Sequence, residues 1–498
     1  MLDKLKYIYT RLTADGSTGE QAVRSGVWVT GINVGDRVLQ ILKLVLLARL
    51  LSPTAFGLLG IALLVVAALK QFSQLGFDEA LIQHRDENVD GYLNTAWVMK
   101  VLRGLLIAVV AFAFAPYISE FFDEPQAHRL IQVLGVSPLI LGLQNPAVVY
   151  FEKHLNFHKD FVYQVGGRLV DLVVAALFAL AFRSVWALVA GIVAMNLARF
   201  VISYAIHPYR PTIEFDLERG REMFGFGKWM FASSILMFLY GQGDDVFVGW
   251  FFTASTLGFY QLAYRFSNAP ASEVTQVISR VAFPAFSKVQ DDVDRLRNGY
   301  FRAVQLSSIV AFPMAAGIAA VAPQFVHAAL GTQWAPMVPL MQVLAVWGAI
   351  RAFGANVGAV FKAIGRPDFD VRLQVIKTAT IALTIYPAAE YFGVLGVAFV
   401  IVGSSFVVQP IALHLVLSSI DGELGELLGL VAYPLVGSVC MFAAVVGVDT
   451  FLLARQGLVE LLVLIGIGAV SYTCFMISVE NWTGYEFVGL YREVRRSL

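Results

Sequence analysis

The chain has 498 residues, of which 58% are hydrophobic and 14% are charged, and its mean hydropathy is +0.70. A soluble protein of this length carries about a quarter charged residues, so the composition excludes the soluble classes and predicts an integral membrane protein. The 36 basic residues balance the 36 acidic ones, and this neutral charge gives no sign of a nucleic-acid partner.

Apolar runs long enough to cross a bilayer follow one another along the chain. A helix rises about 1.5 Å per residue through a hydrocarbon core about 30 Å thick, so a span needs about 20 residues. About fourteen runs meet this length, and their continuity predicts helices rather than barrel strands. Their ranges are 26–50, 55–78, 92–118, 128–150, 160–182, 184–206, 225–251, 255–283, 301–329, 337–363, 370–391, 394–419, 427–453 and 457–478.

Lysine and arginine collect in alternate gaps between these spans. Lys4 and Lys6 precede the first span, Lys153 and Lys159 follow the fourth, and Arg366 follows the tenth. Since basic residues favour the cytoplasmic side, we expect both termini to be cytoplasmic.

A short internal repeat divides the chain. "LLSPTAFGLLGIA" (Leu50–Ala62) matches "FFTASTLGFYQLA" (Phe251–Ala263) without a gap, with Gly57 aligned to Gly258. An even number of spans separates the copies, which predicts two parallel six-helix lobes related by an axis along the membrane normal. The predicted parts are an N-lobe at 1–206, a cytoplasmic linker at 207–224, a C-lobe at 225–420, and two further spans with a tail at 421–498.

Several spans carry polar stripes at helical spacing. Lys70 and Gln74 share a face of the second span, Asp36 and Lys43 share one in the first, and Arg265 belongs to a stripe in the eighth. A charge facing lipid costs several kcal/mol, so these stripes must face protein or water. They therefore predict an aqueous cavity between the two lobes.

Cations outnumber anions among the charges within the spans. A cation-rich site of low dielectric favours an anion, and the guanidinium fork of arginine suits phosphate. The predicted substrate-binding residues are Asp36, Arg37, Lys43, Lys70, Gln74, Arg103, Tyr260, Tyr264, Arg265, Asn268 and Arg351. The predicted ion-coupling residues are Asp36, Asp244 and Asp245.

The sequence leaves other roles open for several of these groups. Lys43 and Lys70 could reach the interface with their charged ends. Arg168 and Asp171, three residues apart, could form a structural ion pair. The tyrosines of the eighth span could serve packing alone.

Motifs for catalysis or cofactor binding are absent from the sequence. There is no phosphate-binding loop, zinc-protease motif or nucleophile elbow. Cys440 and Cys474 lie in apolar runs and are predicted to be buried free thiols. The sequence therefore favours transport over catalysis, with no cofactor and no metal.

An ordered set of motifs resembles a known family. The chain carries "LARLLSPTAFGLLGIA", "QLGFDEALIQ", "DDVFVGWFFTASTLGFYQLAYR", "FPAFSKVQDD", "ALGTQWAPMVPLMQVLA" and "KAIGRP" in this order. Together they resemble the Wzx-type polysaccharide flippases of the multidrug/oligosaccharidyl-lipid/polysaccharide superfamily. The motif positions, which we interpret as architectural, are Arg49, Pro53, Gly57, Gly76, Asp244, Gly258, Tyr260, Ala263 and Pro284.

The resemblance implies a fold, a substrate and partners. It implies an all-α membrane protein whose two lobes form a V-shaped central cavity. It also implies alternating access that moves undecaprenyl-diphosphate-linked oligosaccharides across the bacterial inner (cytoplasmic) membrane. Such units serve exopolysaccharide, capsule or O-antigen (lipopolysaccharide) synthesis, so a polysaccharide polymerase and a chain-length regulator are the expected protein partners. Two alternatives stay open: a multidrug or cation antiporter of the same fold, and an enzyme acting on lipid-linked sugars.

Overall fold

The computed structural model describes residues 18–73, 90–154, 156–214, 217–452, 457–483 and 485. All regular secondary structure in these residues is helical, as predicted. Nine of the described helical segments are long and apolar enough to cross a membrane. Each predicted span contains helix among its described residues, but only nine segments there meet the length and composition of a membrane span. The number fourteen thus stays a prediction.

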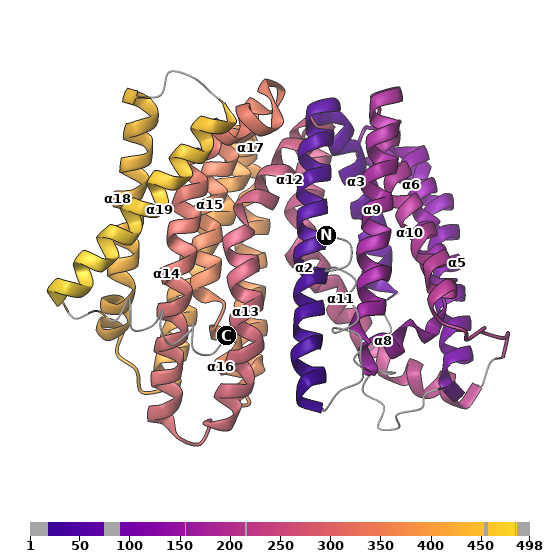
Figure 1. Ribbon diagram of the computed structural model, residues 1–498, viewed down its shortest axis with the longest axis horizontal. Helices are drawn as coiled ribbons and strands as arrows, with labels where there is room; N and C mark the ends of the chain where they lie inside the picture. Colours follow the sequence, from indigo (N-terminus) through magenta and orange to yellow (C-terminus); the bar gives the residue numbers. More distant parts are fainter. Residues whose placement is uncertain are drawn as a thin grey trace, which may run out of the picture. The chain divides into compact units, whose positions relative to one another are not determined.

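The chain divides into two compact units, Met1–Gly258 and Phe259–Leu498. The predicted boundaries, with a linker at 207–224, also stay a prediction. Unit 1 is a helical bundle in which α2 packs along α9, and α9 along α10 (Figure 1). Its helices are α2 Thr18–Leu50, α3 Pro53–Phe72, α5 Asp90–Phe121, α6 Ala127–Gly135, α7 Ser137–Gly142, η1 Pro146–Val148, α8 Val149–Lys153, α9 Phe157–Phe182, α10 Trp186–Ile206 and α11 Leu217–Phe251.

The predicted span at 128–150 is not one continuous helix. It is divided into α6, α7, η1 and α8, because Pro138 and Pro146 have no backbone N–H to donate. Asn145 stabilises the second break: its Oδ1 accepts from the Ala147 N–H at 3.0 Å, and its Nδ2 donates to the Tyr209 carbonyl at 2.8 Å. Because the helix is interrupted at Pro146, the side chain of Gln144 points in a direction that a continuous helix would not give it.

The aligned glycines of the repeat lie against each other's turn within unit 1. A Cβ on Gly57 would stand 1.6 Å from the Ala254 carbonyl oxygen, and one on Gly258 would stand 2.3 Å from the Pro53 carbonyl oxygen. No side chain can move aside there, since both obstacles are backbone atoms. The glycines therefore permit backbone contact between the two copies of the turn.

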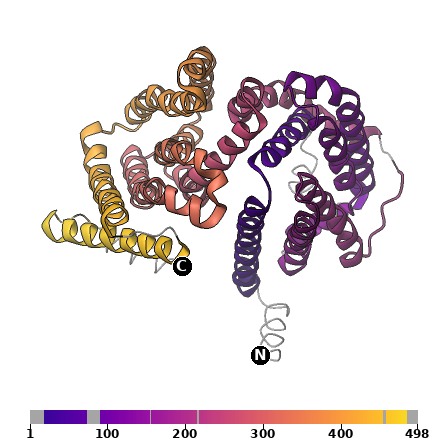
Figure 2. The same cartoon turned by 90° about the horizontal axis from the view of Figure 1, so that it is seen from above.

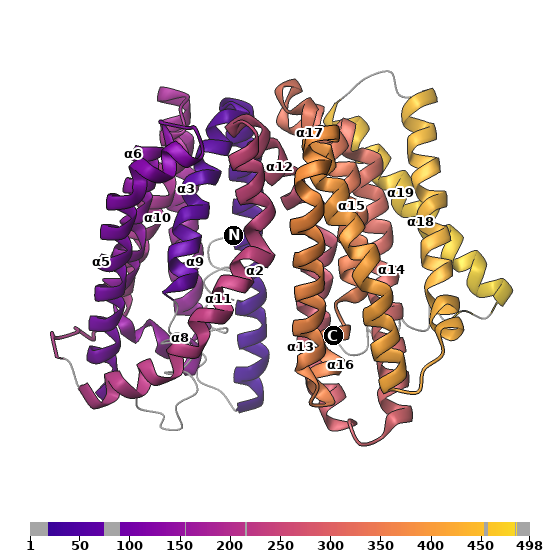
Figure 3. The same ribbon diagram turned by 180° about the vertical axis from the view of Figure 1, so that it is seen from behind.

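Unit 2 is a second helical bundle. Its core joins Tyr300, Phe361 and Val416 from three different helices, and α17 consists of two helices that meet at Gly393 (Figure 3). Its helices are α12 Ala254–Ser267, which begins in unit 1, α13 Ala269–Lys288, α14 Val293–Phe325, η2 Val326–Leu330, η3 Thr332–Met337, α15 Val338–Gly354, α16 Val357–Ala363, α17 Pro367–Ser419, α18 Leu424–Leu452 and α19 Leu458–Thr483.

Two details of unit 2 bear on the prediction. The predicted spans 370–391 and 394–419 are the two halves of α17, which meet at Gly393, where the backbone is not helical and φ is +62°. Cys440 and Cys474 are free but exposed, so the prediction of burial was wrong. The reason is that α18 and α19 pack on α14 along one face and leave the other uncovered, as the edge position of α19 in unit 2 shows (Figure 2).

Candidate functional site

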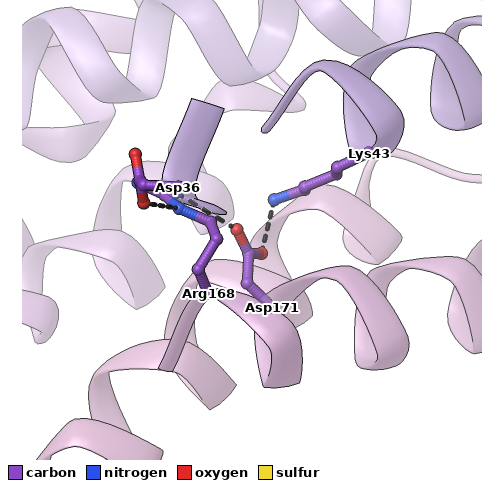
Figure 4. Close-up of polar contacts among 4 residues, drawn as sticks. All are labelled: Asp36, Lys43, Arg168 and Asp171. Atoms are coloured by element: carbon purple, nitrogen blue, oxygen red, sulfur yellow. Dashed lines mark hydrogen bonds and ion pairs between the residues drawn. The ribbon is translucent and has the colours of Figure 1, made fainter. Parts of the chain in front are cut away.

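A network of four charged side chains joins α2 to α9 inside unit 1 (Figure 4). Lys43 pairs with Asp171, whose side chain is only 1% exposed. Arg168 Nε donates to Asp36 Oδ1 at 2.7 Å, and Arg168 Nη1 lies 3.5 Å from Asp171 Oδ2. Two cations thus face two carboxylates, and the network has no net charge.

The network combines two separate predictions. Sequence spacing put Asp36 and Lys43 on one face of the first span, and it suggested an Arg168–Asp171 pair in the fifth. The structure brings both pairs together, because α2 and α9 pack along their length. Removing ions from water is costly, so a buried network persists only where each charge has partners. Arg37, the next residue on α2, has an exposed side chain.

A second cluster in unit 1 surrounds a cavity of about 490 Å³. Lys70 lies in the last turn of α3, while Lys100 and Arg103 lie one turn apart on α5. Asp160 is the one carboxylate among the described lining residues, which leaves a formal excess of two positive charges. This size falls within the range of about 300–1,000 Å³ that is usual for ligand pockets.

Close helix contacts hold the cations in place. A Cβ on Gly142 would stand 2.6 Å from the Lys100 carbonyl oxygen, and one on Gly104 would stand 2.6 Å from the Leu139 Cα, so α5 and α7 touch backbone to backbone. Arg103 Nη2 donates to the Lys70 carbonyl at 2.7 Å, and its Nε donates to Ser73 Oγ at 3.0 Å. Arg103 therefore fixes the end of α3 against α5 and sets the position of Lys70.

Neutral polar groups line the same cavity. Gln144 follows α7 and is 91% buried, and its Oε1 accepts a hydrogen bond from the Tyr163 hydroxyl. Its Nε2 is buried without a hydrogen-bond partner. The Arg199 guanidinium lies over the Tyr163 ring, 5.7 Å from the centroid. A buried amide N–H without an acceptor costs about 1–3 kcal/mol, so the cavity contains an unused donor.

Unit 2 has a cluster of aromatic and cationic side chains on α12, α15 and α17. Arg351 and Lys377 both lie over the Trp347 ring, at 5.2 and 5.5 Å from its centroid. Arg351 also donates to Asn268 Oδ1 at 3.1 Å, and Tyr264 packs on Trp347 with a centroid distance of 4.9 Å. The predicted residues Tyr264, Asn268 and Arg351 are thus neighbours.

The structure places the other predicted residues as follows. Tyr260 is fully buried in packing, Arg265 is exposed, and Asp244 is buried on α11 one residue before Asp245. Gln74 and the motif residue Gly76 lie outside the described residues. Lys100 was not among the predicted residues, although it precedes Arg103 by three residues and so shares its helix face. Gln144 and Tyr163 could not be predicted, since their roles depend on the break after α7.

Comparisons with known proteins identify the family. A family model described as "Polysaccharide biosynthesis protein" matches residues 46–339, more than half of the chain. The chain belongs to this family. The predicted resemblance to the polysaccharide flippases is thereby confirmed.

Named relatives agree with this assignment. The lipopolysaccharide biosynthesis protein WzxC of Escherichia coli (strain K12) is 26% identical over 383 residues, covering 76% of this chain and 78% of WzxC. The teichuronic acid biosynthesis protein TuaB of Bacillus subtilis (strain 168) is 24% identical, covering 77% and 80%. The probable low-salt glycan biosynthesis flippase Agl15 of Haloferax volcanii is 22% identical, covering 95% and 99%.

Solved structures show the fold. The lipid II flippase MurJ in an inward closed conformation superposes with a TM-score of 0.72 at 14% identity, covering 91% of this chain and 98% of MurJ. An inward-facing multidrug resistance MATE transporter of the MOP superfamily gives a TM-score of 0.62 at 18% identity, covering 78% and 94%. The protein is a multi-pass membrane protein with the transporter fold of this superfamily.

Proposed function

We propose that this polysaccharide biosynthesis protein is a flippase, which moves polyprenyl-diphosphate-linked oligosaccharides across the cytoplasmic membrane by alternating access. Three of its relatives bear names that refer to lipopolysaccharide, teichuronic acid and glycan biosynthesis, and one of these names includes the word flippase. On this proposal both termini are cytoplasmic, and a polymerase and a chain-length regulator act on the exported units.

The observation that carries the proposal is the positive cavity inside the membrane-spanning helices of unit 1. Lys70, Lys100 and Arg103 face a single described carboxylate there. Ionisable groups within a membrane bundle are costly, and they mark substrate pathways. A surplus of cations favours an anionic head group, such as the diphosphate of a lipid-linked sugar. It disfavours the cationic drugs that a multidrug antiporter would export.

The membrane potential supplies a driving force for this export. An inside-negative potential favours outward movement of an anion by about 2.3 kcal/mol per charge per 100 mV. A diphosphate that keeps two charges in transit would gain about twice that amount. Asp36, Asp244 and Asp245 are the proposed sites for a coupling ion, should the charge be neutralised during transport.

Deletion of the gene followed by analysis of lipid-linked glycans tests the proposal. We expect intact repeat units to accumulate on the inner leaflet and surface polymer to disappear, with both effects reversed by the wild-type chain. The variants Arg37→Ala and Arg265→Ala should insert normally yet fail to restore polymer. Normal surface polymer in the deletion strain, with no accumulated lipid-linked units, would contradict the proposal.

A further inference from the structure

A second cavity of unit 1, about 660 Å³ in volume, lies between α6 and the start of α10. The two helices pack against each other (Figure 3). The volume falls within the range of about 300–1,000 Å³ that is usual for ligand pockets. Its described lining residues are all different from those of the cavity around Lys70, so the two cavities are separate.

This cavity and Lys70 belong to opposite ends of the bundle. The connection from α5 to α6 lies beside the start of α12, because the Ala254 N–H donates to Glu124 Oε1 at 3.1 Å. Ala254 also lies against Gly57, near the start of α3. Lys70 is in the last turn of α3, and the 20 residues of this helix span about 30 Å. On the proposed topology, with cytoplasmic termini, the second cavity lies at the outer end of unit 1.

Polar side chains without protein partners collect around this second cavity. Gln126, His128, Arg129 and Gln132 come from the first two turns of α6, and Trp186 is the first residue of α10. Within the described part of the chain, these five side chains make no hydrogen bond, ion pair or ring contact. The Trp186 side chain is 39% exposed. All five are therefore available to a ligand.

Packing holds the backbone around the cavity in place. The other face of α6 is buried through Ile131 and Leu134. A Cβ on Gly135 would stand 2.5 Å from the Ala111 Cβ, so α6 lies very close to α5. Only three residues join α9 to α10, and the first of them, Arg183, ends α9 with a φ of 46°. A rigid frame of this kind lowers the entropic cost of binding.

The hydrogen-bonding capacity of the lining favours a sugar over a phosphate. The carboxamides of Gln126 and Gln132 each offer an acceptor as well as donors, and the neutral imidazole of His128 offers one of each. An ionised phosphate only accepts hydrogen bonds and would leave these acceptors unused, whereas a sugar hydroxyl both donates and accepts. Trp186 adds a flat apolar face with a polar edge, which suits the apolar face of a pyranose ring.

We propose that this second cavity is a saccharide-binding site at the outer end of unit 1. Trp186 packs on a sugar ring, Gln126 and Gln132 exchange hydrogen bonds with its hydroxyls, and Arg129 accommodates an acidic substituent, since no carboxylate is among the described lining residues. The occupant is a sugar of the exported oligosaccharide, and this source rests on the proposed function. The site gives unit 1 a contact with the glycan that is remote from the diphosphate.

Binding of a labelled oligosaccharide to the purified full-length protein in phosphatidylcholine nanodiscs tests the site. The probe is the repeat unit released by partial hydrolysis of the surface polymer of the strain that carries the gene, without lipid or diphosphate. Fluorescence anisotropy should show saturable binding that weakens at least about fivefold in Trp186→Ala and in Gln132→Leu. Trp186→Phe, which keeps a flat ring, should stay within about twofold of the wild type. The matched control is Trp482→Ala, at a tryptophan that is 92% exposed on α19, and it should bind as the wild type does.

Three results would overturn the site. The first is the absence of saturable binding by the wild type. The second is equal binding by the wild type, Trp186→Ala and Gln132→Leu; a lower unfolding temperature of Trp186→Ala would then identify Trp186 as an anchor at the membrane surface. The third is competition by glycerol 1-phosphate as strong as that by the unlabelled oligosaccharide, which would assign the cavity to a lipid head group.

The site and the proposed function can fail separately. Oligosaccharide binding that depends on Trp186 and Gln132, in a protein whose deletion leaves polymer export intact, supports the site and overturns the flippase proposal. Lipid-linked units that accumulate in the deletion strain, with no oligosaccharide binding by the purified protein, support the flippase proposal and overturn the site.

Discussion

Replacing Asp171 by asparagine should destabilise the protein more than replacing Asp171 and Lys43 together. Asp171 is nearly inaccessible and faces both Lys43 and Arg168. The single change Asp171→Asn removes the carboxylate that faces both of these cations. Removing one partner of a buried ion pair costs about 3–5 kcal/mol, whereas removing both is often close to neutral.

The double variant Lys43→Met with Asp171→Asn restores neutrality, since Arg168 still pairs with Asp36 at 2.7 Å. Asparagine has nearly the same size as aspartate, so it preserves the close packing against Gly191, where a Cβ would lie 2.5 Å from Asp171 Oδ1. We therefore expect the double variant to recover at least about 2 kcal/mol of the loss.

Thermal unfolding of the detergent-solubilised protein measures both effects. A loss of about 3–5 kcal/mol corresponds to a fall in Tm of roughly 6–20 °C for a unit of this size. The control is Asp294→Asn, which breaks an exposed pair with Arg297 at 2.7 Å and should cost under about 1 kcal/mol. The reasoning is refuted if Asp171→Asn matches this control, or if the double variant unfolds as early as the single one.

Three other predictions follow from the packing and from the site. Gly57→Ala should lower the free energy of unfolding by about 1–3 kcal/mol or more, because its Cβ meets the Ala254 carbonyl. Gly241→Ala, with open space around it, should be tolerated, and equal Tm values for the two variants would contradict the prediction. Gly393→Ala should lower the free energy of unfolding by about 1–3 kcal/mol, because φ +62° with ψ −150° is almost restricted to glycine. Gly403→Ala, also in α17, is the control, and equal stability of the two variants would show that the backbone at Gly393 is not strained by a side chain. Trp347→Leu should reduce polymer export without changing the amount of protein in the membrane, because Arg351 and Lys377 both lie over this ring. Trp482→Leu, at an exposed tryptophan, should export normally, and equal export by both variants would contradict a role for the cluster around Trp347.

Features that depend on local sequence could be predicted, and features that depend on packing between helices could not. Helical spacing placed Asp36 and Lys43 on one face, and a turn motif aligned Gly57 with Gly258. Periodicity along a single helix cannot show which helix packs against it. The sequence therefore did not reveal that Asp36 and Lys43 meet Arg168 and Asp171 in a neutral network.

The cavity of unit 1 was only partly predictable for the same reason. Lys70 and Arg103 were selected because charge within an apolar run is costly. Gln144 was hidden in an apparently continuous span, 128–150, although Pro138 and Pro146 were visible signals of a break. Tyr163 was not predicted, because its role depends on a hydrogen bond to Gln144, 19 positions earlier in the sequence.

A proteoliposome assay with the purified protein and a fluorescent polyprenyl-diphosphate oligosaccharide tests the central claim most directly. Chemical quenching from outside reports the fraction of labelled lipid that has crossed between the leaflets. We predict that the wild type and Lys288→Gln, at an exposed lysine in the last turn of α13, equilibrate the label, and that Lys100→Gln does so at least tenfold more slowly. Label that stays in its original leaflet with the wild-type protein, as in protein-free liposomes, would contradict the account.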